Sequence, residues 1–140
     1  QLLLEKNINV NAQAGHYGTA LIAASLEGYL NIAQLLLEKN ANVNSQAGHY
    51  GTALIAASLR GHLKIAQLLL DKNADVNAQA ECYGTALIAA SLEGHLKIAQ
   101  LLLEKNVNVN AQVGHYGTAL IAASLKGHLE IAQLLLEKNA

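Results

Sequence analysis

The chain of 140 residues contains no Phe, Trp, Met or Pro, and Tyr, with five copies, is its only aromatic residue type. A conventional globular core mixes large and small apolar side chains to reach close packing, and that mixture is missing here. Instead, 52% of the residues are hydrophobic, and Leu, with 27 copies, and Ala, with 25, supply most of them. This composition predicts one kind of helix contact that the chain makes repeatedly.

An excess of charge of either sign is also missing, since nine Lys and Arg stand against ten Asp and Glu, for a formal net charge of −1. No basic cluster could meet a phosphate backbone or anionic lipid, so we expect neither nucleic acid nor membrane as a partner. No apolar run approaches the roughly 20 residues of a membrane span.

The single cysteine, Cys82, cannot form an internal disulfide, which favours a reducing compartment. We therefore expect a cytoplasmic protein. The sequence opens on Gln1 and Leu2–Leu4, which look like the middle of a helix, so it is expected to be part of a longer chain.

A repeat of 33 residues organises the whole sequence. The string YGTALIAASL begins at Tyr17, Tyr50, Tyr83 and Tyr116 without insertion or deletion, and 23 of the 33 columns are unchanged in every copy. We therefore predict a single array without linkers or separate domains. It divides into a partial repeat, residues 1–13, and the repeats 14–46, 47–79, 80–112 and 113–140.

Each period predicts two short helices and a loop. Thr19 is a natural N-cap, the helix formers of Ala20–Leu26 follow, and Gly28 can end the helix in a left-handed conformation. Apolar residues at helical spacing predict a second helix over residues 30–38, and the Asn- and Gly-rich residues 41–51 predict an extended finger. Helices this short are unstable alone, so neighbouring pairs must stabilise one another by stacking.

The wording of the repeat resembles that of ankyrin repeats. The period of 33 is accompanied by GTALIAAS at Gly18–Ser25, GHLKIAQLLL at Gly61–Leu70 and NADVNAQ at Asn73–Gln79. The resemblance covers all 140 residues, and the variant wording is similar to repeats in fungal receptor-like proteins. It implies an all-α, ankyrin-type α-solenoid of helix-turn-helix repeats joined by β-hairpin-like fingers.

Two departures from the family pattern bear on the fold. An Ile column replaces the usual His, so we expect apolar contact where the family has hydrogen bonds. An Asn column replaces the usual Gly after the second helix, at little cost because Asn tolerates the left-handed conformation. The two columns are Ile22, Ile55, Ile88 and Ile121, and Asn40, Asn73 and Asn106.

Six His residues suggest a metal site. His16, His49 and His115 share a column with Cys82, but each belongs to a different repeat. Packed helix layers lie roughly 8–10 Å apart, whereas zinc ligands all lie about 2 Å from the ion. We therefore expect no metal site and no cofactor, and interpret the column as a solvated or partner-facing fingertip.

Other polar columns suggest structural roles. His62, His95 and His128, which share a column with Tyr29, are expected to fix the turn into the second helix, and the column Asn44, Asn77 and Asn110 to stabilise the fingers. The column Ser25, Ser58, Ser91 and Ser124 lacks the base and orienting acid that a nucleophile needs. We therefore predict no catalytic residue and no enzyme activity.

The resemblance implies that fingers and first helices face a protein partner. Tyr side chains are enriched at binding hot spots, the Leu column tends to be exposed in the family, and a charged column alternates in sign. In the alternative interpretation, Tyr packs against the next finger and Leu closes the edge of the core. The candidate residues for partner binding are His16, Tyr17, Leu26, Glu27, His49, Tyr50, Leu59, Arg60, Cys82, Tyr83, Leu92, Glu93, His115, Tyr116, Leu125 and Lys126.

The sequence thus predicts a non-catalytic scaffold that presents a rigid inner surface to a protein or peptide. The alternative is a structural or engineered repeat scaffold, a self-associating spacer with no specific partner. Both ends of the chain carry Leu faces without a polar cap, at Leu2–Leu4 and Leu134–Leu136, so end-to-end association is also predicted.

Overall fold

The structure is a computed structural model, which describes residues 8–138. This part of the chain folds into eight helices arranged as four successive pairs, which confirms the predicted all-α stack. The helices are α2 (Ala20–Glu27), α3 (Leu30–Glu38), α4 (Ala53–Arg60), α5 (Leu63–Asp71), α6 (Ala86–Glu93), α7 (Leu96–Leu103), α8 (Ala119–Lys126) and α9 (Leu129–Glu137).

The first helix of each pair begins and ends as its sequence predicts. The side-chain oxygen of Thr19 accepts a hydrogen bond of 3.1 Å from the backbone N–H of Ile22, and the Thr of each later repeat caps its helix in the same way. Gly28 ends α2 with φ 84°, a left-handed conformation that a side chain would disfavour. The helix therefore extends one residue beyond the predicted Leu26, to Glu27.

The second helices end in two ways. Asn40 and Asn73 adopt φ angles of 69° and 68°, which confirms them as left-handed stops. Asn106 does not have a positive φ, so the prediction is wrong there, and α7 ends early, at Leu103. In this repeat the N–H of Val107 bonds to the carbonyl of Lys105, two residues earlier, and the chain leaves the helix by a different turn.

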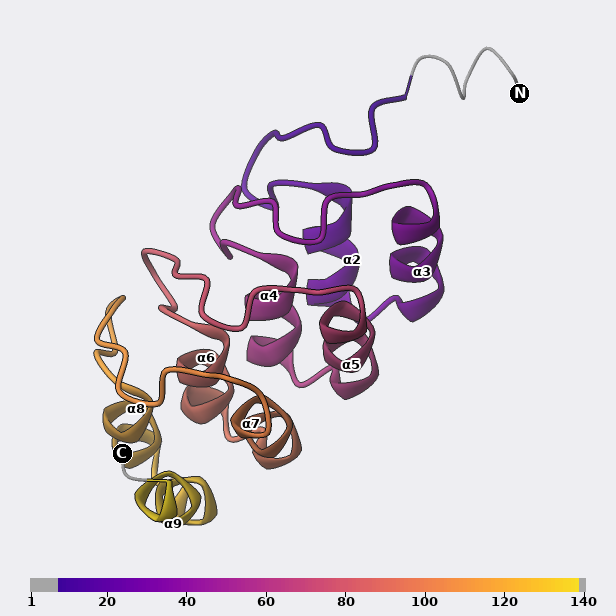
Figure 1. Cartoon of the computed structure of the whole chain (residues 1–140). Helices are drawn as coiled ribbons and strands as arrows, with labels where there is room; N and C mark the ends of the chain where they lie inside the picture. The colour runs from indigo at the N-terminus through magenta and orange to yellow at the C-terminus, as the bar shows by residue number, and fades with distance from the viewer. Residues whose placement is uncertain (1–7, 139–140) are drawn as a thin grey trace.

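The pairs stack in two rows (Figure 1). The helices α2, α4, α6 and α8 contact one another in sequence, as do α3, α5, α7 and α9 in the second row, and the fingers project on the side of the first row. Leu, Ile and Ala side chains from both rows form one core. Ala33, Ala66 and Ala99 are fully buried, as expected where small side chains let helices approach closely.

Asn side chains join each finger to the next. The side-chain oxygen of Asn44 accepts a hydrogen bond of 2.7 Å from the N–H of Asp75, and its amide nitrogen donates to the carbonyl of Asn73 over 3.3 Å. Asn77 makes the equivalent pair of bonds to Asn108 and Asn106. These contacts confirm the predicted stabilising role for Asn44 and Asn77, and they show that the role is to set the register between repeats.

The His column after the first helices has a similar role. Nε2 of His62 donates a 3.0 Å hydrogen bond to the carbonyl of Leu26 in the preceding repeat, and His95 and His128 bond in the same way to Leu59 and Leu92. Because a carbonyl oxygen only accepts, Nε2 of each ring carries a proton. Each imidazole thus fixes its own turn and covers the end of the previous first helix.

Candidate functional site

The tips of the four fingers form one continuous surface. We call it the fingertip surface, and it consists of His16, Tyr17, His49, Tyr50, Cys82, Tyr83, His115 and Tyr116. The backbone N–H of His49 donates to the carbonyl of His16 over 2.7 Å, and the N–H of His115 donates to the carbonyl of Cys82 over 3.1 Å. Backbone hydrogen bonds therefore join the first fingertip to the second and the third to the fourth.

Aromatic rings stack along this surface. The imidazoles of His16 and His49 lie 4.7 Å apart between centroids, at an interplanar angle of 15°. The phenol rings of Tyr17 and Tyr50 are 6.2 Å apart, and those of Tyr50 and Tyr83 are 5.8 Å apart and nearly parallel. The two columns also touch each other, since the His49 ring meets the edge of Tyr50 with centroids 5.0 Å apart.

These distances correct the predicted spacing of the fingertip column. We expected about 8–10 Å between repeats, which is the separation of packed helices, but Sγ of Cys82 lies only 3.7 Å from Nδ1 of His49. Side chains at the tips of adjacent fingers are therefore in direct contact. Even so, among the described residues no three His, Cys, Asp or Glu side chains are grouped as a metal site would require.

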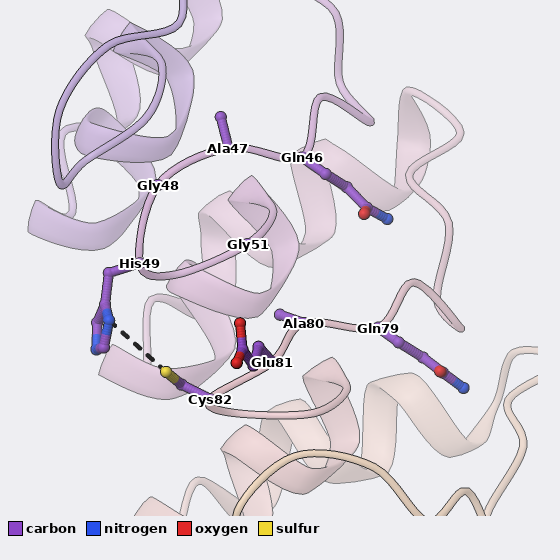
Figure 2. A pocket seen from close by; sticks show the side chains of 9 residues that line it. All are labelled: Gln46, Ala47, Gly48, His49, Gly51, Gln79, Ala80, Glu81 and Cys82. Carbon is purple, nitrogen blue, oxygen red and sulfur yellow. Dashed lines mark hydrogen bonds between the residues drawn. The ribbon is translucent and has the colours of Figure 1, made fainter.

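A shallow pocket lies between the second and third fingers (Figure 2). The His49 ring faces the sulfur of Cys82 on one side, while Gln46 and Gln79 point away from that pair. Glu81 also lines the pocket and is exposed. The pocket is a gap between adjacent loops, and its walls offer an imidazole, a thiol and a carboxylate to the solvent.

The Tyr column combines the two alternative arrangements. Tyr17 is 49% exposed, whereas Tyr50 is only 8% exposed because neighbouring rings cover both of its faces. Tyr83 and Tyr116 are half-buried. The pKa of Tyr83 is raised above its ordinary value of 10.0. Burial is the largest cause, and the nearby phenols of Tyr50 and Tyr116 add to it. Tyr17 is thus the most accessible ring of the column and Tyr50 the least.

The Leu column is mostly part of the core, which contradicts the predicted exposure. Leu26, Leu59 and Leu92 are at most 5% exposed, because the first helix of the following repeat covers each of them. Leu125 is 65% exposed, since no described repeat follows α8. In this array, the column closes the contact between repeats and is unavailable to a partner along the inner face.

The charged column lies at the surface throughout. Glu27, Arg60, Glu93 and Lys126 are all exposed, each at the last position of its first helix. They remain a candidate contact surface beside the fingers. His16 and His115, at the ends of the fingertip column, are exposed as well, and His49 and Cys82 are half-buried between them.

The Leu faces predicted at the two ends of the sequence have different outcomes. Leu2–Leu4 lie outside the described residues. At the other end Leu136 is exposed, Leu134 is half-buried and Leu135 is fully buried, so the predicted exposure of this Leu face is wrong at Leu135.

The Ser column lies in the core of the internal repeats. The hydroxyls of Ser25, Ser58 and Ser91 are buried without a hydrogen-bond partner.

Sequence reasoning missed the close approach of the fingers. A signal was present in the Gly at the second position of most repeats: a Cβ at Gly48 would collide with the carbonyl of His16. Glycine at a position with positive φ and close backbone approach is a reason to expect tight pairing.

Comparison with known proteins agrees with the architecture. A family model described as ankyrin repeats in three copies matches residues 1–80 and 54–140, which together span the chain. No curated protein sequence matches the chain. Among the described helices, none has both the length and the apolar character to cross a membrane.

Proposed function

Because the chain belongs to the ankyrin-repeat family, whose members generally bind proteins, we propose that it is a non-catalytic module that binds a protein or peptide through its inner surface. The contact surface consists of the exposed parts of the fingertip surface and the neighbouring charged column. Leu26, Leu59 and Leu92 are excluded from it, since they lie in the core.

The observation that carries the proposal is the pairing of the fingertips. Backbone hydrogen bonds and ring contacts hold the side chains of the first three fingers in one arrangement before any partner arrives; the rings are those of His16, Tyr17, His49, Tyr50 and Tyr83. A preorganised surface loses little conformational freedom on binding, and that saving favours affinity. The exposed Tyr and His rings offer both apolar area and hydrogen-bonding groups, a combination enriched at binding hot spots.

The charged column favours a partner with charges of both signs. Its side chains alternate between acidic and basic from Glu27 to Lys126, so a segment lying along the stack meets charges of alternating sign. Exposed ion pairs contribute only about 0.2–1 kcal/mol each. They would therefore set the register and orientation of the bound segment, while the fingertips supply most of the affinity.

The test is selection of peptides from a displayed library on the 140-residue chain, followed by calorimetric titration of the selected peptides. Tyr17→Ala combined with Arg60→Glu is expected to weaken binding at least about tenfold, the effect of losing one hot-spot contact. Both residues are exposed, so the fold is retained.

The matched control is Lys64→Glu combined with Lys97→Glu, two exposed positions on the second helices. Binding should be unchanged in this variant. Peptides that lose affinity with the control pair but keep it with the fingertip pair would overturn the proposed surface.

A further inference from the structure

The third finger differs from the other three at one position of its tip. Glu81 stands where the first, second and fourth fingers have Gly15, Gly48 and Gly114. These glycines adopt φ angles of 69°, 70° and 79°, a conformation that a side chain disfavours. Glu81 does not have a positive φ. The backbone of the third finger therefore turns differently at its tip.

The glycines allow the backbones of neighbouring fingers to touch. A Cβ at Gly48 would collide with the carbonyl of His16 in the first finger, and a Cβ at Gly114 would lie 2.7 Å from the backbone nitrogen of Gly84 in the third. Glu81 carries such a Cβ. The third finger therefore cannot approach the second as the second approaches the first.

The seam between the second and third fingers lacks the backbone bond that the other two seams have. The N–H of His49 donates to the carbonyl of His16, and that of His115 to the carbonyl of Cys82. Among the described residues, the N–H of Cys82 makes no equivalent bond to the carbonyl of His49. The seam is crossed instead by side chains, and the carbonyl of His49 is left as a free acceptor.

A pocket of about 310 Å³ lies at this seam, and we call it the Glu81 pocket. The Glu81 side chain points from the third finger toward the second (Figure 2). Its carboxylate is exposed and makes no ion pair or hydrogen bond with the described part of the chain. The pocket therefore combines a free negative charge with the free carbonyl of His49, which also lines it.

The charge of the fingers favours a cation in this pocket. The four finger segments, residues 8–18, 41–51, 74–84 and 107–117, contain no Lys or Arg. Their only charged residues are Asp75 and Glu81, which are both acidic and both belong to the third finger. A basic side chain that approaches the third fingertip thus meets acceptors and negative charge, without a competing cation from the fingers themselves.

We propose that the Glu81 pocket binds an arginine side chain of the protein partner. This proposal names the chemistry of the partner and rests on the proposed function of the fingertip surface. A guanidinium has five N–H donors and no acceptor, so it matches a pocket that offers a carboxylate and a backbone carbonyl. Charge-assisted bonds of this kind are about twice as strong as neutral ones. Lysine carries the same charge without the planar fork, so it binds more weakly.

The test uses N-acetylarginine amide as the probe and nuclear magnetic resonance of the labelled 140-residue chain as the readout. We expect the backbone amide signals of His49, Glu81 and Cys82 to shift and to saturate at millimolar probe concentrations, on the order of the affinity of a single small contact. N-acetylcitrulline amide has nearly the same shape without the charge, and it should bind at least about tenfold more weakly.

Two variants of Glu81 separate its charge from its effect on the seam. Glu81→Gln keeps the Cβ and the open seam but removes the charge, and it should weaken probe binding at least about tenfold. Glu81→Gly restores the residue of the other fingers and lets the N–H of Cys82 bond to the carbonyl of His49. In that variant probe binding should be lost, and hydrogen exchange at the Cys82 amide should slow at least about tenfold.

The matched control is Glu104→Gln, which removes an exposed carboxylate after α7, away from the fingers. Probe binding should be unchanged. Equal probe binding by the unmodified chain and Glu81→Gln would overturn the proposal. So would a Cys82 amide that exchanges at the same rate in Glu81→Gly, since Glu81 would then not hold the seam open.

Failure of this proposal can be told apart from failure of the proposed function. Selected peptides that lose affinity with the Tyr17→Ala and Arg60→Glu pair, but bind Glu81→Gln as tightly as the unmodified chain, would overturn the arginine pocket and leave the fingertip surface in place. Binding of the arginine probe by a chain that selects no peptide would support the pocket and contradict the proposed function.

Discussion

At the scale of single residues, the Ser column shows how position in the stack changes the energetics of one side chain. Ser25, Ser58 and Ser91 are fully buried and their hydroxyl oxygens have no hydrogen-bond partner, whereas Ser124 is exposed. A buried hydroxyl without a partner has lost its water and gained nothing in return. The column therefore carries a cost in the internal repeats that is absent at the end.

Replacing Ser58 with Ala should consequently stabilise the protein. We expect the free energy of unfolding to rise by about 1 kcal/mol, because the substitution removes an unpaired buried hydroxyl and improves helix propensity. Urea denaturation measures the change. Ser124→Ala is the control, since it changes only the propensity, and it should raise stability by less. A loss of stability in Ser58→Ala would mean that the hydroxyl has a partner in solution.

At the scale of the elements, the helix ends could be predicted because the groups that start and stop each first helix lie within a few residues in sequence. Thr19 and Gly28 act through the backbone beside them, and both adopt the predicted roles. The left-handed stop at Asn106 was wrong, since its repeat leaves the helix by another turn. Local signals thus identified most of the element boundaries.

The Gly that ends each first helix has a second role that a comparison of two copies can isolate. Gly61→Ala is expected to lose more stability than Gly127→Ala. In both variants, a side chain in the left-handed conformation lowers the free energy of unfolding by roughly 1–2 kcal/mol. Of the two positions, only Gly61 has a His ring close by, 2.5 Å from where the Cβ would lie. Chemical denaturation of both variants measures the difference. Equal losses would mean that the His95 ring moves aside without cost.

At the scale of the whole molecule, the repeats are nearly identical in sequence but not in environment. An array in which each repeat contacts only its neighbours has two ends, and the same residue is covered in the middle and uncovered there. The Leu column demonstrates this, since Leu59 is 5% exposed and Leu125 is 65% exposed. The predicted exposure of this column was wrong at Leu26, Leu59 and Leu92 for that reason.

The same substitution should therefore have different effects along the stack. We expect Leu59→Ala to lower the free energy of unfolding by about 2–5 kcal/mol, the cost of removing a buried Leu, and Leu125→Ala to lower it by less than about 0.5 kcal/mol. Urea denaturation of the 140-residue chain measures both losses. Similar losses in the two variants would contradict the exposed end of the array.

The fold could be predicted from sequence because its information is periodic and local. The period of 33 residues, the caps and the apolar spacing recur in every copy, and they led to the paired, stacked helices that the structure contains. The structural roles of His62 and Asn44 could be anticipated as well, because polar side chains at turns usually bond to nearby backbone.

The proposed binding surface depends on contacts between repeats, which the aligned sequences of the repeats do not show. The distance and orientation between neighbouring repeats decide whether Tyr50 is covered and how closely His49 approaches Cys82. They also decide which Leu of the column is left uncovered. Identical sequences therefore give identical helices, while exposure and contact differ from repeat to repeat because each depends on what lies next in the stack.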